Sequence, residues 1–324
     1  MTTQEKVGVL IFLGSIALIY GLEFLLLVDV VRERFKSKRL SRRFFSRSAI
    51  LVHFLALVGV VCFLYGYFVE PYWLEVNTIS IQTEKLKAAS VRIVQISDLH
   101  CDKKARNEER IVEIVNSLNP DIVVFTGDSL NTAEALGRFK DTLSRLKAHI
   151  GKFAVDGNFE VDYWGGLDLY TGTGFELLDE EAVRLEKDGE VFYISGLSYH
   201  NPPQMPHVLK KVPDAAYSVF LHHVPCLIED IGDLNADLYI CGHTHGGQVA
   251  LPFYGALTTL SRYGKKYERG MYEVGKTKLY VNRGIGMEGG LAPRVRFCAR
   301  PEITVFDIGP KGAEGGLDGQ KTKE

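Results

Sequence analysis

The sequence is poor in cysteine, with five in 324 residues, an odd number without regular spacing. This pattern excludes the disulfide framework on which small secreted domains depend. The chain also lacks a Gly-x-Ser-x-Gly elbow and a glycine-rich phosphate loop that ends in lysine, and it has no internal repeat. No motif therefore indicates a serine nucleophile or a nucleotide-binding loop of that kind.

A large excess of charge of either sign is also missing, because the net charge is −2. The charge is unevenly spread, however. Residues 32–47 hold eight Lys or Arg and one Glu, a net charge of +7, so the rest of the chain carries −9. A nucleic-acid-binding domain places its basic stripe on the folded body. The acidic body of this chain leads us to expect no nucleic-acid binding.

Two apolar runs flank the basic block. The first, Val7 to Val28, contains one charge, Glu23, and the second, Ala49 to Val69, contains only His53. At about 1.5 Å per residue, each is long enough to cross a bilayer core of about 30 Å. The first run is too long for a signal peptide and has no small-residue cleavage site; a pair of buried soluble helices is the alternative. We predict a membrane anchor, residues 1–70, with transmembrane helices at about 7–28 and 49–69, a basic loop at 32–47, and Glu23 facing the second helix or the interface.

The basic loop also bears on orientation. The positive-inside rule places it in the cytoplasm, which puts both termini and everything after Pro71 outside. A re-entrant or surface-lying pair, with the body on the cytoplasmic face, is the alternative. An aromatic belt at the bilayer surface is indicated after the second run by Tyr65, Tyr67, Tyr72 and Trp73.

The remainder, residues 71–308, reads as one α/β domain. Strands predicted at 91–97, 121–126 and 152–156 alternate with helices at 111–118 and 136–146, which indicates a parallel sheet with right-handed crossovers. The second half has hairpins at 182–196 and 269–282, and strands at 217–221, 238–241 and 302–308. We expect two sheets packed face to face with helices outside. The tail, 309–324, is rich in Gly and Lys and is predicted to be disordered.

Polar residues stand where the predicted strands end, which is where open α/β sheets bind ligands. Singly, each has another explanation: a helix N-cap for an aspartate, a turn for an asparagine, a satisfied core imidazole for a histidine. Together, they offer carboxylate and imidazole ligands for a pair of divalent metals about 3.5–4 Å apart with one bridging carboxylate. The set is Asp98, His100, Asp128, Asn158, His223, His243 and His245.

These residues form five ordered blocks that resemble the calcineurin-like metallophosphoesterases, over about residues 90–308. The blocks are Asp98-x-His100, Gly127-Asp128, Gly157-Asn158, His223 and Gly242-His243-x-His245. The last block continues as Gly246-Gly247-Gln248, which resembles its continuation in a bacterial membrane-anchored branch of the family. The resemblance implies an α/β (α+β) fold of two mixed β-sheets flanked by helices, and the bacterial cytoplasmic membrane as the location.

The resemblance also implies roles for the seven residues. One metal would be held by Asp98, His100, Asp128 and His245, and the other by Asp128, Asn158, His223 and His243, with Asp128 as the bridge. Asp128, Asn158 and His243 would be catalytic. His223 is preferred to His222 because the family's ligand stands two residues before a proline, here Pro225. The metals would be Mn, Fe, Zn or Mg.

The implied reaction is hydrolysis of a phosphoester by in-line attack of a metal-bridging hydroxide, most simply by a phosphodiesterase. One position departs from the family pattern: Phe159 stands where a histidine usually helps to protonate the leaving group. That substitution favours a pyrophosphate or other activated substrate, or an acid supplied by His222 or Glu160. A pyrophosphatase of a nucleotide-linked glycolipid precursor (UDP-diacylglucosamine type) and a catalytically impaired metal-binding scaffold are therefore the alternatives.

A substrate-binding segment is predicted after the last block, where residues 252–267 mix aromatics with cations. Arg262, Lys265 and Lys266 would contact the phosphate of an amphipathic, lipid-linked or cell-envelope phosphoester, and Arg283 and Arg300 are further candidates. An ordinary solvated loop is the alternative explanation.

Overall fold

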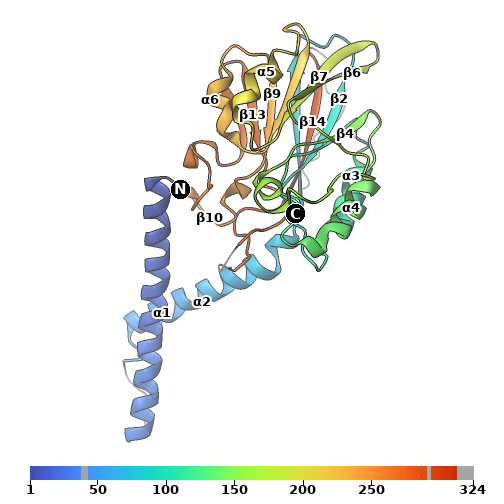
Figure 1. Ribbon diagram of the computed structural model, residues 1–324. Coiled ribbons are helices and arrows are strands. Elements are labelled where there is room, and N and C mark those ends of the chain that lie inside the picture. Colours follow the sequence, from blue (N-terminus) through green and yellow to red (C-terminus); the bar gives the residue numbers. More distant parts are fainter. Residues whose placement is uncertain (38–42, 290–292, 312–324) are drawn as a thin grey trace.

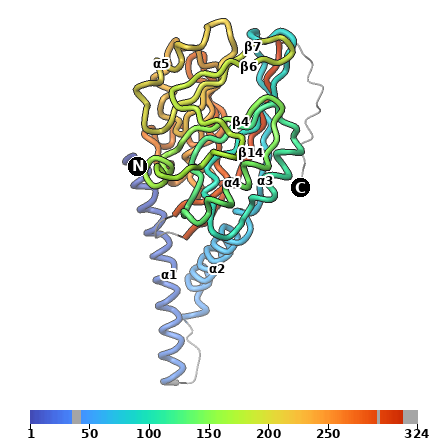
Figure 2. The backbone as a smooth tube through the Cα atoms, turned by 45° about the vertical axis from the view of Figure 1, so that its right-hand side comes forward, coloured from blue at the N-terminus to red at the C-terminus, as the bar shows by residue number. Residues whose placement is uncertain are grey.

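Two long helices project from one side of the folded domain (Figures 1 and 2). The computed structural model describes residues 1–37, 43–289 and 293–311. Helix α1 spans Thr3–Ser37 and α2 spans Arg47–Phe68, and both are long and apolar enough to cross a membrane. They pack on each other, and the Nδ1 of His53 lies 2.6 Å from the Oε2 of Glu23. Glu23 therefore faces the second helix, as predicted.

The basic segment differs from the prediction in one respect. Helix α1 continues through Ser37, so the first basic residues, Arg32 and Arg34, are helical rather than part of a loop. Arginine and glutamate are good helix formers, and no proline or glycine interrupts the helix there. Residues 38–42 of the predicted loop and residues 312–324 of the predicted disordered tail lie outside the described residues. Gly309 and Pro310 were also predicted to be disordered, but they end the strand Glu302–Pro310, because they pair with Gln82 and Thr83.

The first sheet of the domain contains the parallel strands predicted from the first half. Its order is β1-β14-β2-β3-β4-β5, with β2 to β5 parallel and β14 antiparallel to β2. The helices α3 (Glu108–Ser117) and α4 (Leu136–Arg145) form crossovers. The strands are β1 (Glu75–Thr83), β2 (Val91–Ile96), β3 (Ile122–Phe125), β4 (Gly151–Ala154), β5 (Glu176–Leu177) and β14 (Glu302–Pro310). Strands β1 and β5 were not predicted.

The second sheet contains both predicted hairpins. Its order is β12-β13-β9-β8-β7-β6, and β8 and β9 run parallel at its centre. The short helices α5 (Met205–Leu209) and α6 (Ile228–Ile231) accompany it, and a small hairpin, β10 (Ala250–Leu251) with β11 (Gly255–Ala256), follows β9. The strands are β6 (Glu181–Lys187), β7 (Glu190–Leu197), β8 (Tyr217–His222), β9 (Leu238–Cys241), β12 (Gly270–Val274) and β13 (Thr277–Val281).

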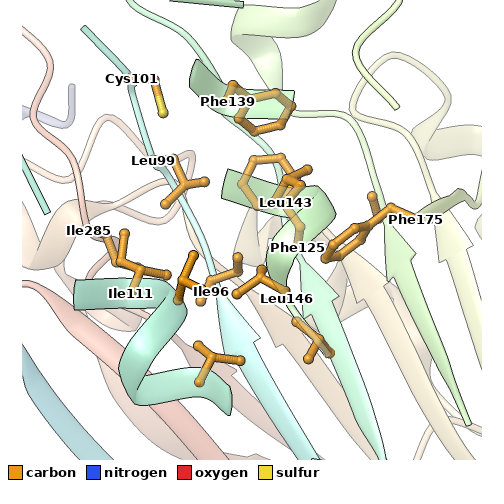
Figure 3. Packing of buried hydrophobic residues seen from close by; sticks show 14 of the residues in the cluster. Ile96, Leu99, Cys101, Ile111, Phe125, Phe139, Leu143, Leu146, Phe175 and Ile285 are labelled. Atoms are coloured by element: carbon orange, nitrogen blue, oxygen red, sulfur yellow. The ribbon is translucent and has the colours of Figure 1, made fainter. Parts of the chain in front are cut away.

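Side-chain alternation along the strands explains the layers. In β2, Val91 and Ile93 pack between the two sheets, whereas Val94 and Ile96 belong to the cluster under α3 and α4. Figure 3 shows this outer cluster, in which Phe125 of β3 lies among side chains of both helices. Each such fully buried side chain stabilises the fold by about 1.5–3 kcal/mol. A third cluster covers the outer face of the second sheet. The predicted arrangement of two mixed sheets between helices is confirmed.

Candidate metal centre

The first group of predicted ligands gathers between the ends of β2, β3 and β9. The Nε2 atoms of His100 and His245 lie 3.2 Å apart. The Nε2 of His245 is 3.5 Å from an oxygen of Asp98, and the Nε2 of His100 is 3.5 Å from an oxygen of Asp128. These four side chains are buried and together could hold a metal ion.

The second group shares Asp128 with the first. The Nε2 of His223 lies 3.3 Å from Asp128 and 3.0 Å from the Oδ1 of Asn158. The Nδ1 of His243 is 3.0 Å from the same Asn158 oxygen and 3.2 Å from His223 Nε2. Donor atoms that share an ion at bond lengths of about 2.0–2.2 Å stand roughly 3.0–3.5 Å apart. The structure thus brings together both predicted ligand sets, around Asp128.

The chemistry of the donors fits cations. Two pairs of imidazole nitrogens face each other, and when both atoms of a pair carry lone pairs a cation between them relieves the repulsion. The Nδ1 of His223 lies 2.7 Å from the carbonyl oxygen of Thr126, which keeps a proton on Nδ1 and directs Nε2 toward the centre. Burial lowers the pKa of His100 and that of His243 to about 4, so both rings are neutral and able to act as ligands.

His223 and Asp128 behave as a coupled pair. Burial lowers the pKa of His223, but the adjoining Asp128 carboxylate outweighs burial and raises that pKa to about 10. In turn, burial raises the pKa of Asp128, but the charge and hydrogen bond of His223, together with His100 and the backbone N–H of Phe159, lower it below its usual value. The site therefore places a negative bridge beside a position that attracts positive charge.

Most of the predicted ligands have strained backbones. Asp98, His100, Asp128, His243 and His245 have φ angles of 50°, 40°, 60°, 71° and 52°, in the left-handed region that non-glycine residues rarely adopt. Such strain costs about 1–3 kcal/mol per residue and persists only where the surroundings enforce it. Close packing contributes, because a Cβ on Gly242 would lie 2.2 Å from an oxygen of Asp98. This strain is the cost of directing the ligands into one space.

Glu160 holds two of the ligand-bearing loops through hydrogen bonds to their backbone. Its two buried carboxylate oxygens accept hydrogen bonds from the backbone N–H groups of Gly157, Asp128 and Ser129, at 2.7, 2.9 and 2.6 Å. This side chain joins the loop after β3 to the loop after β4. It is fully engaged with backbone and is not free to act as the acid that the sequence suggested.

His222, the other suggested acid, does not reach the centre. It is the last residue of β8, and its Nδ1 lies 2.8 Å from the carbonyl oxygen of Leu197, away from the cluster. Its ring stacks with Phe220, which belongs to the outer cluster of the second sheet. His223 is the residue that turns inward, because the chain leaves the strand there.

Phe159 occupies the edge of the centre. Its ring stands edge-on to His100, with 4.5 Å between centroids, and it also contacts Tyr163. Its backbone N–H donates to the Oδ1 of Asp128 over 2.9 Å. The backbone thus helps to orient the bridging carboxylate, whereas the side chain presents an apolar ring with no proton to give.

Two residues near the centre were not found from the sequence. Arg296 is fully buried and donates to the carbonyl oxygens of Gly286, Arg283 and Ala299, with its Nη2 3.3 Å from His245 Nδ1. Glu288 has its backbone held on both sides by the side chain of Gln248. Burial, followed by the charge of Asp128, raises the pKa of Glu288. Both stand in an irregular stretch without periodicity, so no sequence pattern singled them out.

The predicted substrate cations lie in different settings. Arg283 donates to Glu302 over 2.8 Å and to Glu75 over 2.7 Å. Lys265 pairs with Glu268, and Lys266 with Glu229.

Of the two remaining arginines, one contacts a carboxylate and the other does not. Arg300 stacks on Trp73 and lies 3.5 Å from Glu75. Arg262 is exposed, lies over the ring of Tyr263 and pairs with no carboxylate among the described residues. Phosphate binding by any of the five cations stays a prediction, and Arg262 is the exposed one that pairs with no carboxylate in the described part of the chain.

A two-sheet sandwich with clustered Asp, Asn and His side chains at the strand ends is the architecture of a metallophosphoesterase. Residues 91–247 match the family model for calcineurin-like phosphoesterases. The chain is 33% identical over 259 residues to the uncharacterized metallophosphoesterase YkuE of Bacillus subtilis, covering 75% of this chain and 89% of that one. It is 30% identical over 260 residues to a metallophosphoesterase of Aquifex aeolicus, covering 75% and 95%.

A further relative has a named activity. The UDP-2,3-diacylglucosamine pyrophosphatase LpxG of Chlamydia muridarum is 25% identical over 333 residues, covering 81% of this chain and 97% of that one. The chain therefore belongs to the calcineurin-like phosphoesterase family, and it is a metal-dependent phosphoric ester hydrolase.

Proposed function

We propose that this protein is a membrane-anchored hydrolase with two divalent metals that cleaves phosphoanhydride bonds, such as those of a lipid-linked pyrophosphate. The observation that supports the proposal most directly is the setting of Phe159. Its ring stands beside His100 at the edge of the centre, where the family pattern has a histidine that helps the leaving group depart.

The predicted ligand residues would hold the two ions. Asp98, His100 and His245 would bind one, Asn158, His223 and His243 the other, and Asp128 both. A bound pair of divalent ions would lower the pKa of a water molecule and neutralise charge on the phosphoryl oxygens. Glu160 and the backbone N–H of Phe159 would keep the Asp128 carboxylate and its loop in place.

The leaving group decides between substrates. An alkoxide must be protonated as it departs, and a general acid accelerates that step by about 10²–10⁴-fold. A phosphate that departs from a pyrophosphate is a weaker base and needs this help less. Phe159 cannot donate, Glu160 is bonded to three backbone N–H groups, and His222 faces away. This arrangement favours substrates whose leaving group departs without being protonated.

A phosphodiesterase is the second candidate, and Glu288 favours it. This carboxyl accepts no hydrogen bond from the described residues, and its pKa is raised by burial and by Asp128, so that it holds a proton more readily than an exposed carboxyl. A protonated Glu288 would supply the acid that Phe159 does not.

Membrane anchoring by α1 and α2 is the second part of the proposal. The two helices have the length and composition of membrane spans, and the basic residues between them favour a domain outside the cytoplasm. Hydrolysis of a nucleotide-linked glycolipid precursor, the activity in the name of LpxG, would instead require the domain to face the cytoplasm. A reporter enzyme fused to the C-terminus, active on only one side of the membrane, separates these locations.

The leaving-group argument is tested with Phe159→His and three substrates: a lipid pyrophosphate, bis-p-nitrophenyl phosphate and a dialkyl phosphodiester. We expect wild-type protein to hydrolyse the first two much faster than the third. Phe159→His should raise dialkyl turnover about 10-fold or more and change the other two only a few-fold, because only the alkoxide needs an acid. Glu288→Gln is the matched variant, and it should lower dialkyl turnover only if Glu288 is the acid.

Each result decides between the candidates. Wild-type turnover of the dialkyl ester as fast as that of the pyrophosphate, lost in Glu288→Gln, would replace the first candidate by the second. Absence of turnover on all three substrates, in protein shown to carry two metals, would point to a metal-binding scaffold.

A further inference from the structure

The segment from Pro252 to Gly264, which we call the rim segment, exposes apolar side chains beside the metal centre. Phe253 is fully exposed, and Leu260 is 52% exposed. Both have left-handed φ angles, 64° and 53°, a conformation that is strained for a non-glycine residue. The chain is therefore strained at two positions where it presents a large apolar side chain outward.

The rim segment is attached to the first residues of α1. The buried carboxylate of Glu5 accepts hydrogen bonds from the N–H and the hydroxyl of Thr259, at 2.7 and 2.8 Å. Tyr254 adjoins Gly8, where an added Cβ would lie 2.4 Å from the tyrosine hydroxyl. Figure 1 shows this junction, where the start of α1 meets the loops around β10.

These contacts set the depth of the segment along the helix. The apolar run of α1 begins at Val7, so Glu5 stands just outside it and Gly8 just inside. With α1 across a bilayer, Tyr254 and its neighbour Phe253 lie at the level where the apolar interior begins. Tyrosine and tryptophan side chains concentrate at that level in membrane proteins.

The same segment reaches the metal centre. The carbonyl oxygen of Leu260 lies 3.5 Å from the Nε2 of His243, and Leu260 directly follows Thr259, the residue bonded to Glu5. Arg262, two residues on, is exposed and pairs with no carboxylate among the described residues. Within four residues, the rim therefore joins a membrane helix, a candidate metal ligand and a cation suited to a phosphate group.

We infer that the rim segment rests on the bilayer, with Phe253 and Leu260 in the lipid interface, and that the metal centre takes its substrate from the membrane surface. The substrate class would be an amphipathic phosphate whose acyl chains stay in the bilayer while its head group passes Arg262 to reach the metals. The substrate part rests on the proposed function, whereas the lipid contact stands without it.

The lipid contact is tested by fluorescence in the full-length protein. Phe253→Trp is made in a background with Trp73→Phe and Trp164→Phe and reconstituted in phosphatidylcholine–phosphatidylglycerol vesicles, with and without brominated acyl chains. Since interfacial side chains lie about 5–10 Å deep, bromine should quench this fluorescence by about half or more. Arg184→Trp in the same background is the control, because Arg184 is exposed on β6, away from the helices (Figure 1). Equal quenching at both positions would overturn the inference.

The substrate part is tested with Phe253→Ser and its apolar control, Phe253→Leu. Phe253→Ser should lower turnover of a lipid pyrophosphate in vesicles about 10-fold and leave turnover of soluble bis-p-nitrophenyl phosphate within about two-fold, since serine removes the apolar contact that holds the segment at the bilayer. Phe253→Leu should retain most lipid turnover. Unchanged lipid turnover in Phe253→Ser would overturn uptake from the membrane. Wild-type protein inactive on both substrates would contradict the proposed function, while quenching would still decide the lipid contact.

Discussion

The floor of the metal centre, by which we mean Asp128 and the residues bonded to it, contrasts with the rim segment in how its side chains are held. On the floor, Asp128 contacts two histidines and accepts the N–H of Phe159, and its loop is tied to Glu160. On the rim, Phe253 and Arg262 point outward and have few partners among the described residues. Strained backbone therefore has two uses here: it directs ligands inward at the metal centre and apolar side chains outward on the rim segment.

The same contrast separates the arginines near the site. Arg283 is embedded between two glutamates, and Arg296 is fully enclosed by backbone carbonyls. These residues hold the chain around His245. Arg262 forms no such contacts with carboxylates in the described part of the chain, so its guanidinium group remains available to a substrate.

The largest effect is expected from removing the centre of the floor. Asp128→Ala should abolish binding of both metals and reduce turnover by about 10³-fold or more, because the carboxylate belongs to both ligand groups and metal chemistry contributes several kcal/mol. Metal content per chain and turnover on bis-p-nitrophenyl phosphate measure this. Asp102→Asn is the control, since Asp102 pairs with Arg106 and Arg294 instead. Full metal content in Asp128→Ala would show that the floor is wrongly assigned.

A smaller but large effect is expected for Arg283, and it falls on stability. Arg283→Ala leaves the buried Glu302 without its charged partner, which should lower the free energy of unfolding by about 3–5 kcal/mol. Arg262→Ala, at an exposed position, should change it by no more than about 0.5 kcal/mol. Denaturant unfolding of both variants gives the comparison. If Arg283→Ala were as stable as wild type and only raised the KM, the arginine would be a substrate contact after all.

The smallest effect on metal binding is expected for His222. His222→Ala should leave the metal content close to that of wild type, because its ring is bonded to Leu197 outside the cluster. His223→Ala should lose one metal, since the His223 Nε2 faces Asp128 and Asn158. Metal analysis of the two purified variants shows which histidine is a ligand. Loss of metal in His222→Ala but not in His223→Ala would exchange the roles of the two histidines.

Much of the site could be predicted because its residues follow strands with clear patterns. The apolar runs before Asp98, Asp128 and His243 marked strands, and parallel strands bring their carboxyl ends to one edge. The left-handed backbone at these residues could not be predicted, since it is uncommon for any residue other than glycine, even for aspartate and histidine, which adopt it more often than most. Nor could the direction in which His222 and Glu160 point, which depends on where the chain leaves each element.

The two apolar helices, most of the strands and the seven polar residues that follow strands could be predicted from the sequence, because each pattern depends on neighbours within a few positions. The contacts between distant segments could be found only in the folded chain. These include the pairing of β1 with β14, the bond between Glu5 and Thr259, and the enclosure of Arg296 beside His245. Such contacts join residues up to 254 positions apart and leave no periodic trace, so packing alone places the rim beside the start of α1.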